Sequence, residues 1–209
     1  MKKIIALAAL AALSATASAA NLFVDGSFES ISQAAGTWNT YTSVPGWAVT
    51  KANGSATSTG LEIRDNVAGT AEDGKNFIEL DGYENDKIKQ SFATVVGKAY
   101  EISFWFQDRA GVVAASQGFS ANVVSGLATS GTGFGAVGDN GAAWHLITMD
   151  FVAASTTSIF SIAATGNSDG YGTSFDNFQA TAVPEPATLG LFAAGLAVLG
   201  LSQRRRRQQ

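Results

Sequence analysis

Apolar and polar residues alternate along short segments between residues 20 and 182, and clusters of Gly, Asn, Asp and Ser separate these segments. In the clearest segment, residues 99–107, aromatic and aliphatic residues at even positions alternate with Glu, Ser, Trp and Gln at odd positions. A period of two is typical of a β-strand and places each set on one face. We expect about ten strands, at residues 22–28, 46–49, 61–64, 76–81, 87–92, 99–107, 119–124, 144–152, 158–163 and 175–181.

This pattern predicts an all-β domain at residues 21–182, folded as a β-sandwich of jelly-roll type. Parallel strands need long crossover helices, and no segment of helical period exceeds two turns. Residues 126–141 are rich in Gly, Ala, Ser and Thr and are expected to form a flexible loop. Residues 133–138 match G-x-G-x-x-G, but no helix-period sequence follows, so we reject a dinucleotide site.

The N-terminus has the three parts of a secretory signal peptide at residues 1–20. Lys2 and Lys3 precede an apolar run at residues 4–13, and small residues follow it. The apolar run is too short to span a bilayer, which needs about 20 residues. We therefore expect export through the Sec translocon and cleavage by signal peptidase after Ala19 or Ala20.

Residues 183–209 form a second tripartite segment. A rigid tetrapeptide, Val183-Pro184-Glu185-Pro186, precedes an apolar run at residues 187–201, and a basic block ends it. The run predicts a single transmembrane helix at about residues 187–202. The basic block is expected to stay on the cytoplasmic side as an anchor, and it consists of Arg204, Arg205, Arg206 and Arg207.

This order of elements resembles the PEP-CTERM family of bacterial sorting signals. The resemblance implies recognition by an exosortase, an integral-membrane cysteine protease thought to cut near the Pro-Glu-Pro sequence. It implies a chain anchored in the inner membrane before processing, then placed in the envelope, at the cell surface or outside the cell. Proteins with such tails carry diverse domains, so the resemblance implies an address and no activity. A plain tail anchor is the alternative, but it leaves Pro184, Glu185 and Pro186 unexplained.

Between the two end segments the domain is acidic. It carries seven basic and sixteen acidic side chains, a net charge of −9. A phosphate backbone would repel this surface, so nucleic acid is not expected as a partner. The chain has no cysteine, which excludes disulfides, thiolate metal sites and thiol nucleophiles.

Residues 21–29, the turn at residues 45–47 and residues 175–178 resemble conserved pieces of the galactose-binding-like jelly rolls, which include many carbohydrate-binding modules. The resemblance implies that Glu29 and Asp176 hold a structural calcium ion between the adjoining termini. Carboxylate oxygens are ligands that calcium selects. The alternative is that Glu29 merely ends a strand and Asp176 forms hydrogen bonds in a turn.

Sugar binding requires exposed aromatic faces with polar groups beside them. Among the Trp and Tyr residues, Trp105 is our main candidate for a ligand platform, with Trp47 as a second candidate, although most such residues serve packing. Catalysis is not expected. His145 is the single histidine, and no catalytic motif accompanies it. Carboxylate pairs such as Glu79 and Asp81 could serve glycoside hydrolysis, but acidic residues on one face of a strand are also expected wherever that face is exposed to water.

We therefore expect a surface protein without catalysis that acts in a matrix or biofilm, in adhesion, or with exopolysaccharide. One alternative is a carbohydrate-binding module for a specific glycan, and another is a glycan-active enzyme. No cofactor is expected besides the calcium ion.

Overall fold

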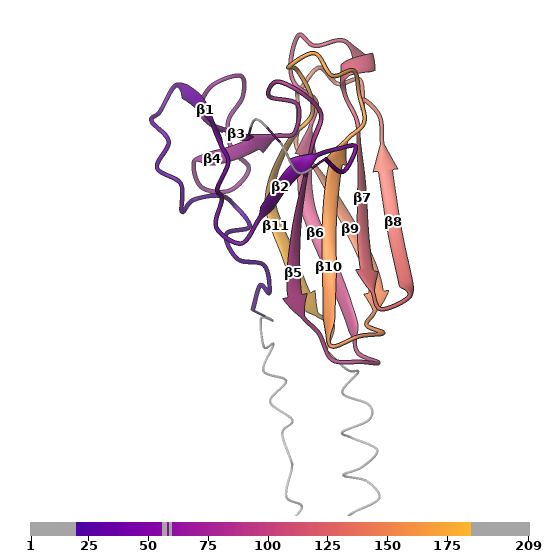
Figure 1. The fold of residues 1–209 in the computed structure, drawn as a ribbon. Coiled ribbons are helices and arrows are strands. Elements are labelled where there is room, and N and C mark those ends of the chain that lie inside the picture. Colours follow the sequence, from indigo (N-terminus) through magenta and orange to yellow (C-terminus); the bar gives the residue numbers. More distant parts are fainter. Residues whose placement is uncertain (1–19, 56–57, 59, 185–209) are drawn as a thin grey trace, which may run out of the picture.

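In the computed structural model, which describes residues 20–55, 58 and 60–184, the alternating segments pair antiparallel into two stacked sheets (Figure 1). The six-stranded sheet has the order β1 (Thr37–Tyr41), β3 (Leu61–Asp65), β4 (Asn76–Glu79), β11 (Ser174–Ala182), β6 (Ala99–Gln107) and β9 (His145–Val152). The five-stranded sheet has the order β2 (Ala48–Lys51), β5 (Asp86–Ala93), β10 (Thr157–Ala164), β7 (Phe119–Ser125) and β8 (Ala128–Phe134). A short 3-10 helix, η1 (Ala114–Ser116), lies between β6 and β7. The predicted all-β jelly-roll sandwich is confirmed.

Aromatic side chains fill the space between the sheets. The even positions of β6 are buried and its odd positions from 101 to 107 are half-buried, as the alternation predicts. Phe178 of β11 is fully buried at the centre of this cluster, and its ring centroid lies 5.3 Å from those of Phe104 and Trp47. Packing of these rings is the main source of stability in a chain without disulfides.

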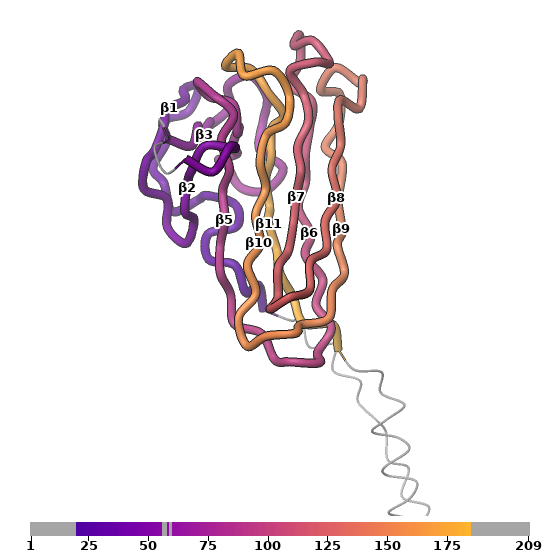
Figure 2. The backbone as a smooth tube through the Cα atoms, turned by 45° about the vertical axis from the view of Figure 1, so that its right-hand side comes forward, coloured from indigo at the N-terminus to yellow at the C-terminus, as the bar shows by residue number. Residues whose placement is uncertain are grey.

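The loops gather at the two ends of the sandwich, as Figures 1 and 2 show. Ala99 pairs with Val152, and Tyr100 pairs with both Phe151 and Ala182, so these strand ends coincide. Loops 94–98, 126–127 and 153–156 and both described termini lie at this end, which we call the terminal end. Loops 80–85, 108–118, 135–144 and 165–173 lie at the opposite end, which we call the distal end.

The strand predicted at residues 22–28 does not form. A backbone hydrogen bond joins Leu22 N to Ala180 O, but Asp25 and Phe28 have φ of 53° and 58°, outside the range of a strand. Phe23 and Phe28 are both buried because the chain folds back on itself between them. Alternation here therefore reflects a turn that buries two aromatic rings and was wrongly assigned to a strand.

The prediction of a flexible loop at residues 126–141 is also wrong in part, because residues 128–134 form β8. This strand pairs with β7 over its whole length and lies at the edge of its sheet. An edge strand of small polar residues covers little of the core, so it shows no apolar alternation. β1 was missed for a similar reason, since residues 37–39 are exposed at the edge of the other sheet.

Candidate functional site

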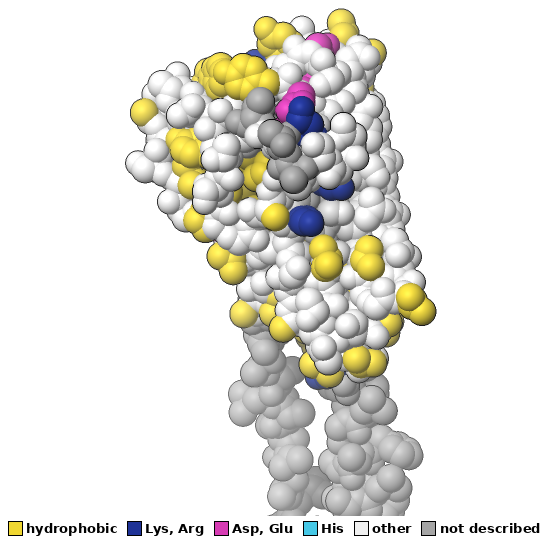
Figure 3. Space-filling view, viewed as in Figure 1, with side chains coloured by type: hydrophobic (Ala, Val, Ile, Leu, Met, Phe, Trp, Pro, Cys, Tyr) yellow, Lys and Arg dark blue, Asp and Glu magenta, His cyan; other side chains and the backbone are white. Residues whose placement is uncertain are grey.

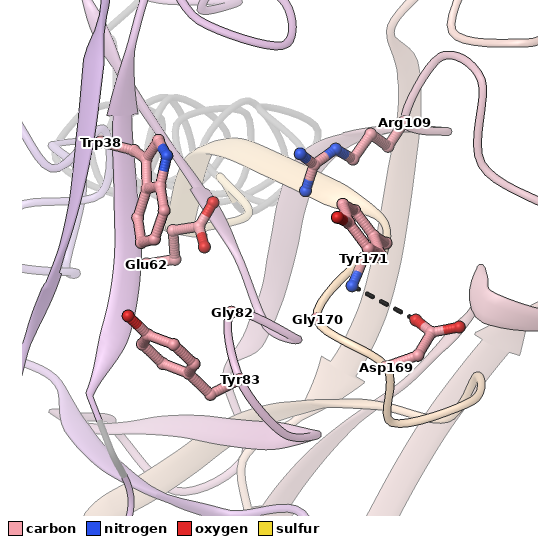
Figure 4. A pocket seen from close by; sticks show the side chains of 8 residues that line it. All are labelled: Trp38, Glu62, Gly82, Tyr83, Arg109, Asp169, Gly170 and Tyr171. Atoms are coloured by element: carbon pink, nitrogen blue, oxygen red, sulfur yellow. Dashed lines mark hydrogen bonds between the residues drawn. The ribbon is translucent and has the colours of Figure 1, made fainter.

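Three exposed aromatic side chains from distant parts of the chain surround a cleft of about 390 Å³ beside β3 (Figure 4). Trp38 comes from β1, Tyr83 from loop 80–85 and Tyr171 from loop 165–173, and their exposed fractions are 46%, 60% and 52%. The remaining lining residues are polar or small, and they are Glu62, Gly82, Arg109, Asp169 and Gly170. Exposed rings around a hollow are typical of a ligand site.

The rings lie on two sides of the cleft. The Trp38 and Tyr83 rings meet edge to face with centroids 6.3 Å apart. Across the cleft, the guanidinium group of Arg109 lies over the Tyr171 ring, with its central carbon 4.7 Å from the ring centroid. Edge-to-face packing and the cation-π contact hold the rings in place before any ligand binds.

Two copies of the tripeptide Asp-Gly-Tyr, at residues 81–83 and 169–171, bring the two tyrosines to the cleft. Asp169 N donates a hydrogen bond of 3.0 Å to Asp81 Oδ2, which joins the two turns. Gly170 has φ of 82°, and a Cβ there would lie 3.3 Å from the Gly82 carbonyl oxygen. Asp81 is only 1% exposed, and burial raises the pKa of its carboxyl group.

A buried ion cluster forms the wall behind the cleft. Glu62 and Glu79 lie opposite each other on β3 and β4, a repulsive arrangement that Arg64 neutralises. Arg64 Nε donates to Glu62 Oε1 at 2.6 Å and Arg64 Nη2 donates to Glu79 Oε2. Arg109 Nη1 lies 3.2 Å from both carboxylate oxygens of Glu79. Burial raises the pKa of Glu79 to about 7, although Arg64 and Arg109 lower it.

The cluster also fixes the loop that carries Tyr171. Gly172 N donates to Glu79 Oε1 at 2.8 Å, and Ser116 Oγ donates to Asp169 Oδ2 at 2.6 Å. Arg109 therefore connects the buried cluster with the Tyr171 ring that lines the cleft. The arrangement offers apolar ring faces for stacking beside charged groups that accept or donate hydrogen bonds.

Of the two predicted platforms, the assignment of Trp47 is wrong. Its side chain is 6% exposed and packs on the rings of Phe23, Phe28 and Phe178. Its indole N–H donates to Asp25 O at 3.1 Å, so both its apolar and polar parts serve the core. Trp105 lies half-buried on the outer face of β6 and is not among the residues that line the cleft. Its role as a platform stays a prediction.

Glu29 and Asp176, the predicted calcium ligands, hold the same loop from two sides. Asp176 Oδ2 accepts hydrogen bonds from the backbone N–H groups of Glu72 and Asp73, and Glu29 Oε1 accepts those of Lys75 and Asn76. In this structure these two carboxylate oxygens therefore accept hydrogen bonds from the backbone, which is the role that the alternative gave to Asp176.

In addition, no three acidic or histidine side chains gather as a metal site within the described part of the chain. Calcium binding stays a prediction. Its test is whether added Ca²⁺ raises the melting temperature and whether the Glu29→Ala substitution abolishes that rise.

The predicted targeting residues lie mostly outside the described residues. Ala20, Val183 and Pro184 are described, whereas Ala19, Glu185, Pro186 and the arginines at 204–207 are not. The helix predicted at about residues 187–202 also lies outside them. Across residues 20–55, 58 and 60–184, no helix has the length and apolar character needed to cross a membrane.

Sequence reasoning placed all three cleft aromatics among its candidate aromatics but did not select them. It also missed Glu62, Arg109 and Asp169 as lining residues. The repeated Asp-Gly-Tyr tripeptide was the available signal, because a glycine beside an exposed tyrosine in a turn favours presentation of the ring. No local signal indicated that Trp38 would join them.

Comparisons with known proteins bear on the tail and on the fold. Residues 182–207 match the PEP-CTERM protein-sorting motif. The motif indicates an exported protein that an exosortase-type system sorts and that is anchored at the envelope. No curated protein matches the chain.

Several solved structures share the fold. The enzymatically active domain of bacteriophage CBA120 tailspike protein 4 matches with a TM-score of 0.51 and 10% identity, over 78% of this chain and 21% of that one. The K2 cleaved adhesin domain of Lys-gingipain matches with a TM-score of 0.50 and 12% identity, over 75% and 96%. TmCBM61 in complex with β-1,4-galactotriose matches with a TM-score of 0.48 and 16% identity, over 78% and 99%. At these identities, the likeness to the tailspike domain and to the adhesin domain shows the fold alone.

Proposed function

We propose that this exported envelope protein is a non-catalytic component of the extracellular matrix that binds a glycan, such as the cell's own exopolysaccharide, in the cleft of Trp38, Tyr83 and Tyr171. The observation that carries the proposal is the set of three exposed rings fixed around one polar cleft. Sugars present apolar C–H faces together with hydroxyl groups, and the cleft offers partners for both.

The cleft is preorganised, which favours affinity for a ligand of modest size. Arg109 and the buried Glu79 hold the Tyr171 loop, and Asp81 ties that loop to the turn of Tyr83. Ligand binding therefore costs little conformational entropy, because these side chains are already ordered. Asp169 is exposed at the rim, where its carboxylate accepts hydrogen bonds from hydroxyl groups.

Among the carboxylates near the cleft, Glu62, Glu79 and Asp81 are buried and Asp169 is exposed, which disfavours hydrolysis by a pair of accessible carboxyl groups. A glycosidase needs two carboxyl groups that reach the scissile bond. Glu79 is fully buried and Asp81 is 1% exposed, so neither side chain reaches a ligand. Glu62 lines the cleft but is 4% exposed and paired with Arg64. These positions support binding without turnover.

The test is binding of the purified full chain to exopolysaccharide from the producing cells, by affinity electrophoresis or on a glycan array. Loss of one stacking face is worth about 1.5 kcal/mol, so Trp38→Ala and Tyr171→Ala should each weaken binding by about tenfold. Trp105→Ala is the matched control, since this tryptophan lies on the same sheet outside the cleft.

The outcomes separate the alternatives. Weaker binding by Trp105→Ala with unchanged binding by Trp38→Ala would move the platform to β6 and contradict the cleft. Failure of the native chain to bind any glycan offered would contradict the proposal and favour a purely structural role in the matrix.

A further inference from the structure

The terminal end of the sandwich carries exposed apolar side chains at the tips of its loops. Val95 is 54% exposed, Val96 is 59% exposed and Leu127 is fully exposed, with Val152 at 59% beside them. Figure 3 shows hydrophobic side chains at this lower end as well as at the upper, distal end, whereas the acidic side chains visible in that view lie only toward the distal end. Several exposed aliphatic side chains at one end of a domain are typical of a surface that contacts a protein or a membrane.

Hydrogen bonds hold these loops in fixed positions. Lys98 N donates to Val95 O at 3.0 Å, and Gly97 with φ of 83° completes a turn that presents Val96 at its tip. The hydroxyl of the buried Tyr100 accepts a hydrogen bond of 2.8 Å from Val95 N. These contacts hold the side chains of Val95 and Val96 in defined positions at the terminal end.

The neighbouring loops are joined in the same way. Thr94 N donates to Thr156 O at 3.0 Å, and Ser125 Oγ accepts hydrogen bonds from the backbone N–H groups of Ala154 and Ser155. Loop 153–156 therefore links the other two loops of the terminal end, and Val96 and Leu127 are presented at the same end of the sandwich.

The charge at this end differs from that of the domain. Loops 94–98, 126–127 and 153–156 contain Lys98 and no acidic residue, although the domain carries a net charge of −9. The loops of the distal end contain five acidic residues, which are Asp81, Glu84, Asp108, Asp139 and Asp169. The loops of the terminal end therefore do not repel an anionic lipid headgroup, whereas the distal loops do.

The chain leaves the sandwich at this end and has little length before the predicted membrane segment. Val183 N still pairs with Ala99 O at 2.9 Å, so the free connection begins after Val183. The four Cα steps from Val183 to Ala187 can span at most about 14 Å. The headgroup region of a leaflet takes about 5–8 Å of this distance. A chain anchored by residues 187–202 therefore holds the terminal end close to the lipid surface.

We propose that the terminal end is a membrane-contact surface, on which Val95, Val96 and Leu127 insert into the outer leaflet while the tail is uncut. The proposal rests on the predicted membrane segment and is independent of glycan binding. The contact orients the domain over the membrane, with the sorting tetrapeptide between the sandwich and the lipid. Exosortase cutting would then release a domain whose remaining lipid contact is a few side chains.

The absence of cysteine permits a direct test on the full chain. Leu127→Cys and, as control, Val113→Cys each receive an environment-sensitive fluorophore. Val113 is 66% exposed and lies in the distal loop 108–118. The chain, with residues 183–209 retained, is reconstituted into vesicles of phosphatidylethanolamine and phosphatidylglycerol, with flotation as the measure of anchoring.

We expect blue-shifted emission from the label at Leu127 and strong quenching of it by spin-labelled lipids, and neither effect for the label at Val113. Adding Val96→Asp to the Leu127→Cys chain should weaken the quenching while flotation persists. A water-exposed label at Leu127 in floated vesicles would overturn the proposal. Failure of the chain to float would overturn it too, because the anchor is its premise. Shielding of Leu127 only when exosortase is also present would assign this surface to a protein partner instead.

Discussion

Replacement of Arg64 by methionine tests whether the buried ion cluster supports the cleft. Arg64 is 1% exposed and faces two carboxylates, Glu62 at 4% and Glu79 at 0% exposure. Methionine fills a similar volume but leaves both carboxylates with Arg109 as the remaining cation of the cluster. Removing one partner of a buried ion pair costs about 3–5 kcal/mol, because the other charge stays desolvated. We expect the free energy of unfolding of Arg64→Met to fall by this amount at pH 8.

The loss should depend on pH, because burial raises the pKa of Glu79 to about 7 from its ordinary value of 4.5. The folded protein therefore binds the Glu79 proton more tightly than the unfolded chain, and this contribution to stability is lost as the pH rises through about 7. Without Arg64 the pKa of Glu79 rises further, and each pKa unit adds about 1.4 kcal/mol to the cost of ionising it. The deficit of Arg64→Met should accordingly be smaller at pH 5 than at pH 8.

Urea denaturation followed by tryptophan fluorescence at pH 5 and pH 8 measures both effects, since Trp47 reports on the core. Lys51→Met is the matched control. It removes the positive charge of the half-exposed ion pair with Glu84. Such a pair contributes less than about 1 kcal/mol to the free energy of unfolding. A loss for Arg64→Met below about 1 kcal/mol, or an equal loss at the two pH values, would refute the reasoning.

Substitutions at three further positions test the core, a buried acid and the cleft. Phe178→Ala should lower the free energy of unfolding by about 3–5 kcal/mol in the same assay, and a loss under about 1 kcal/mol would contradict its central place in the core. Burial raises the pKa of the Asp86 carboxyl group from 3.8 to about 7. The folded protein therefore binds this proton more tightly than the unfolded chain, and the resulting stabilisation is present at acid pH and lost as the pH rises through about 7. Asp86→Asn should therefore raise the free energy of unfolding at pH 8 by up to about 4 kcal/mol and flatten its pH dependence, and an unchanged pH profile would speak against this. Asp81→Ala removes the acceptor for Asp169 N and should weaken glycan binding more than Asp81→Asn, which keeps an acceptor oxygen; equal binding by both would show that this contact does not position the loop.

The strands that contact the core were predictable because burial acts at every second position. β6 matches its predicted residues 99–107, and β5, β7 and β10, whose burial also alternates, differ from the prediction by one residue at most at each end. Local alternation carried no information for the edge strands β1 and β8, whose side chains are mostly exposed, although it did predict the edge strand β9, which buries Ile147 and Met149. It misled at residues 22–28, where Phe23 and Phe28 reach the core from a turn.

The cleft was not predictable because it depends on which distant segments meet. Trp38, Tyr83 and Tyr171 come from three separate segments, and only the pairing of β1 with β3 and the contact between the two Asp-Gly-Tyr turns bring them together. The ion cluster was missed for another reason. Charged side chains on one face of a strand usually face water, but the loops that carry Arg109 and Gly172 cover Arg64 and Glu79.

The positions of the cleft and the terminal end lead to a last prediction on how anchoring and binding relate. Tyr83 and Tyr171 lie in distal loops, whereas Val96 and Leu127 lie in terminal loops, so the length of the long strands separates the two surfaces (Figure 1). An anchored chain therefore presents its cleft away from the lipid, and lipid contact should not compete with a glycan. Glycan affinity should be the same for chain anchored in vesicles and chain in detergent, as measured with the same exopolysaccharide. Loss of affinity on anchoring, restored by cutting the tail, would show instead that the membrane covers the cleft.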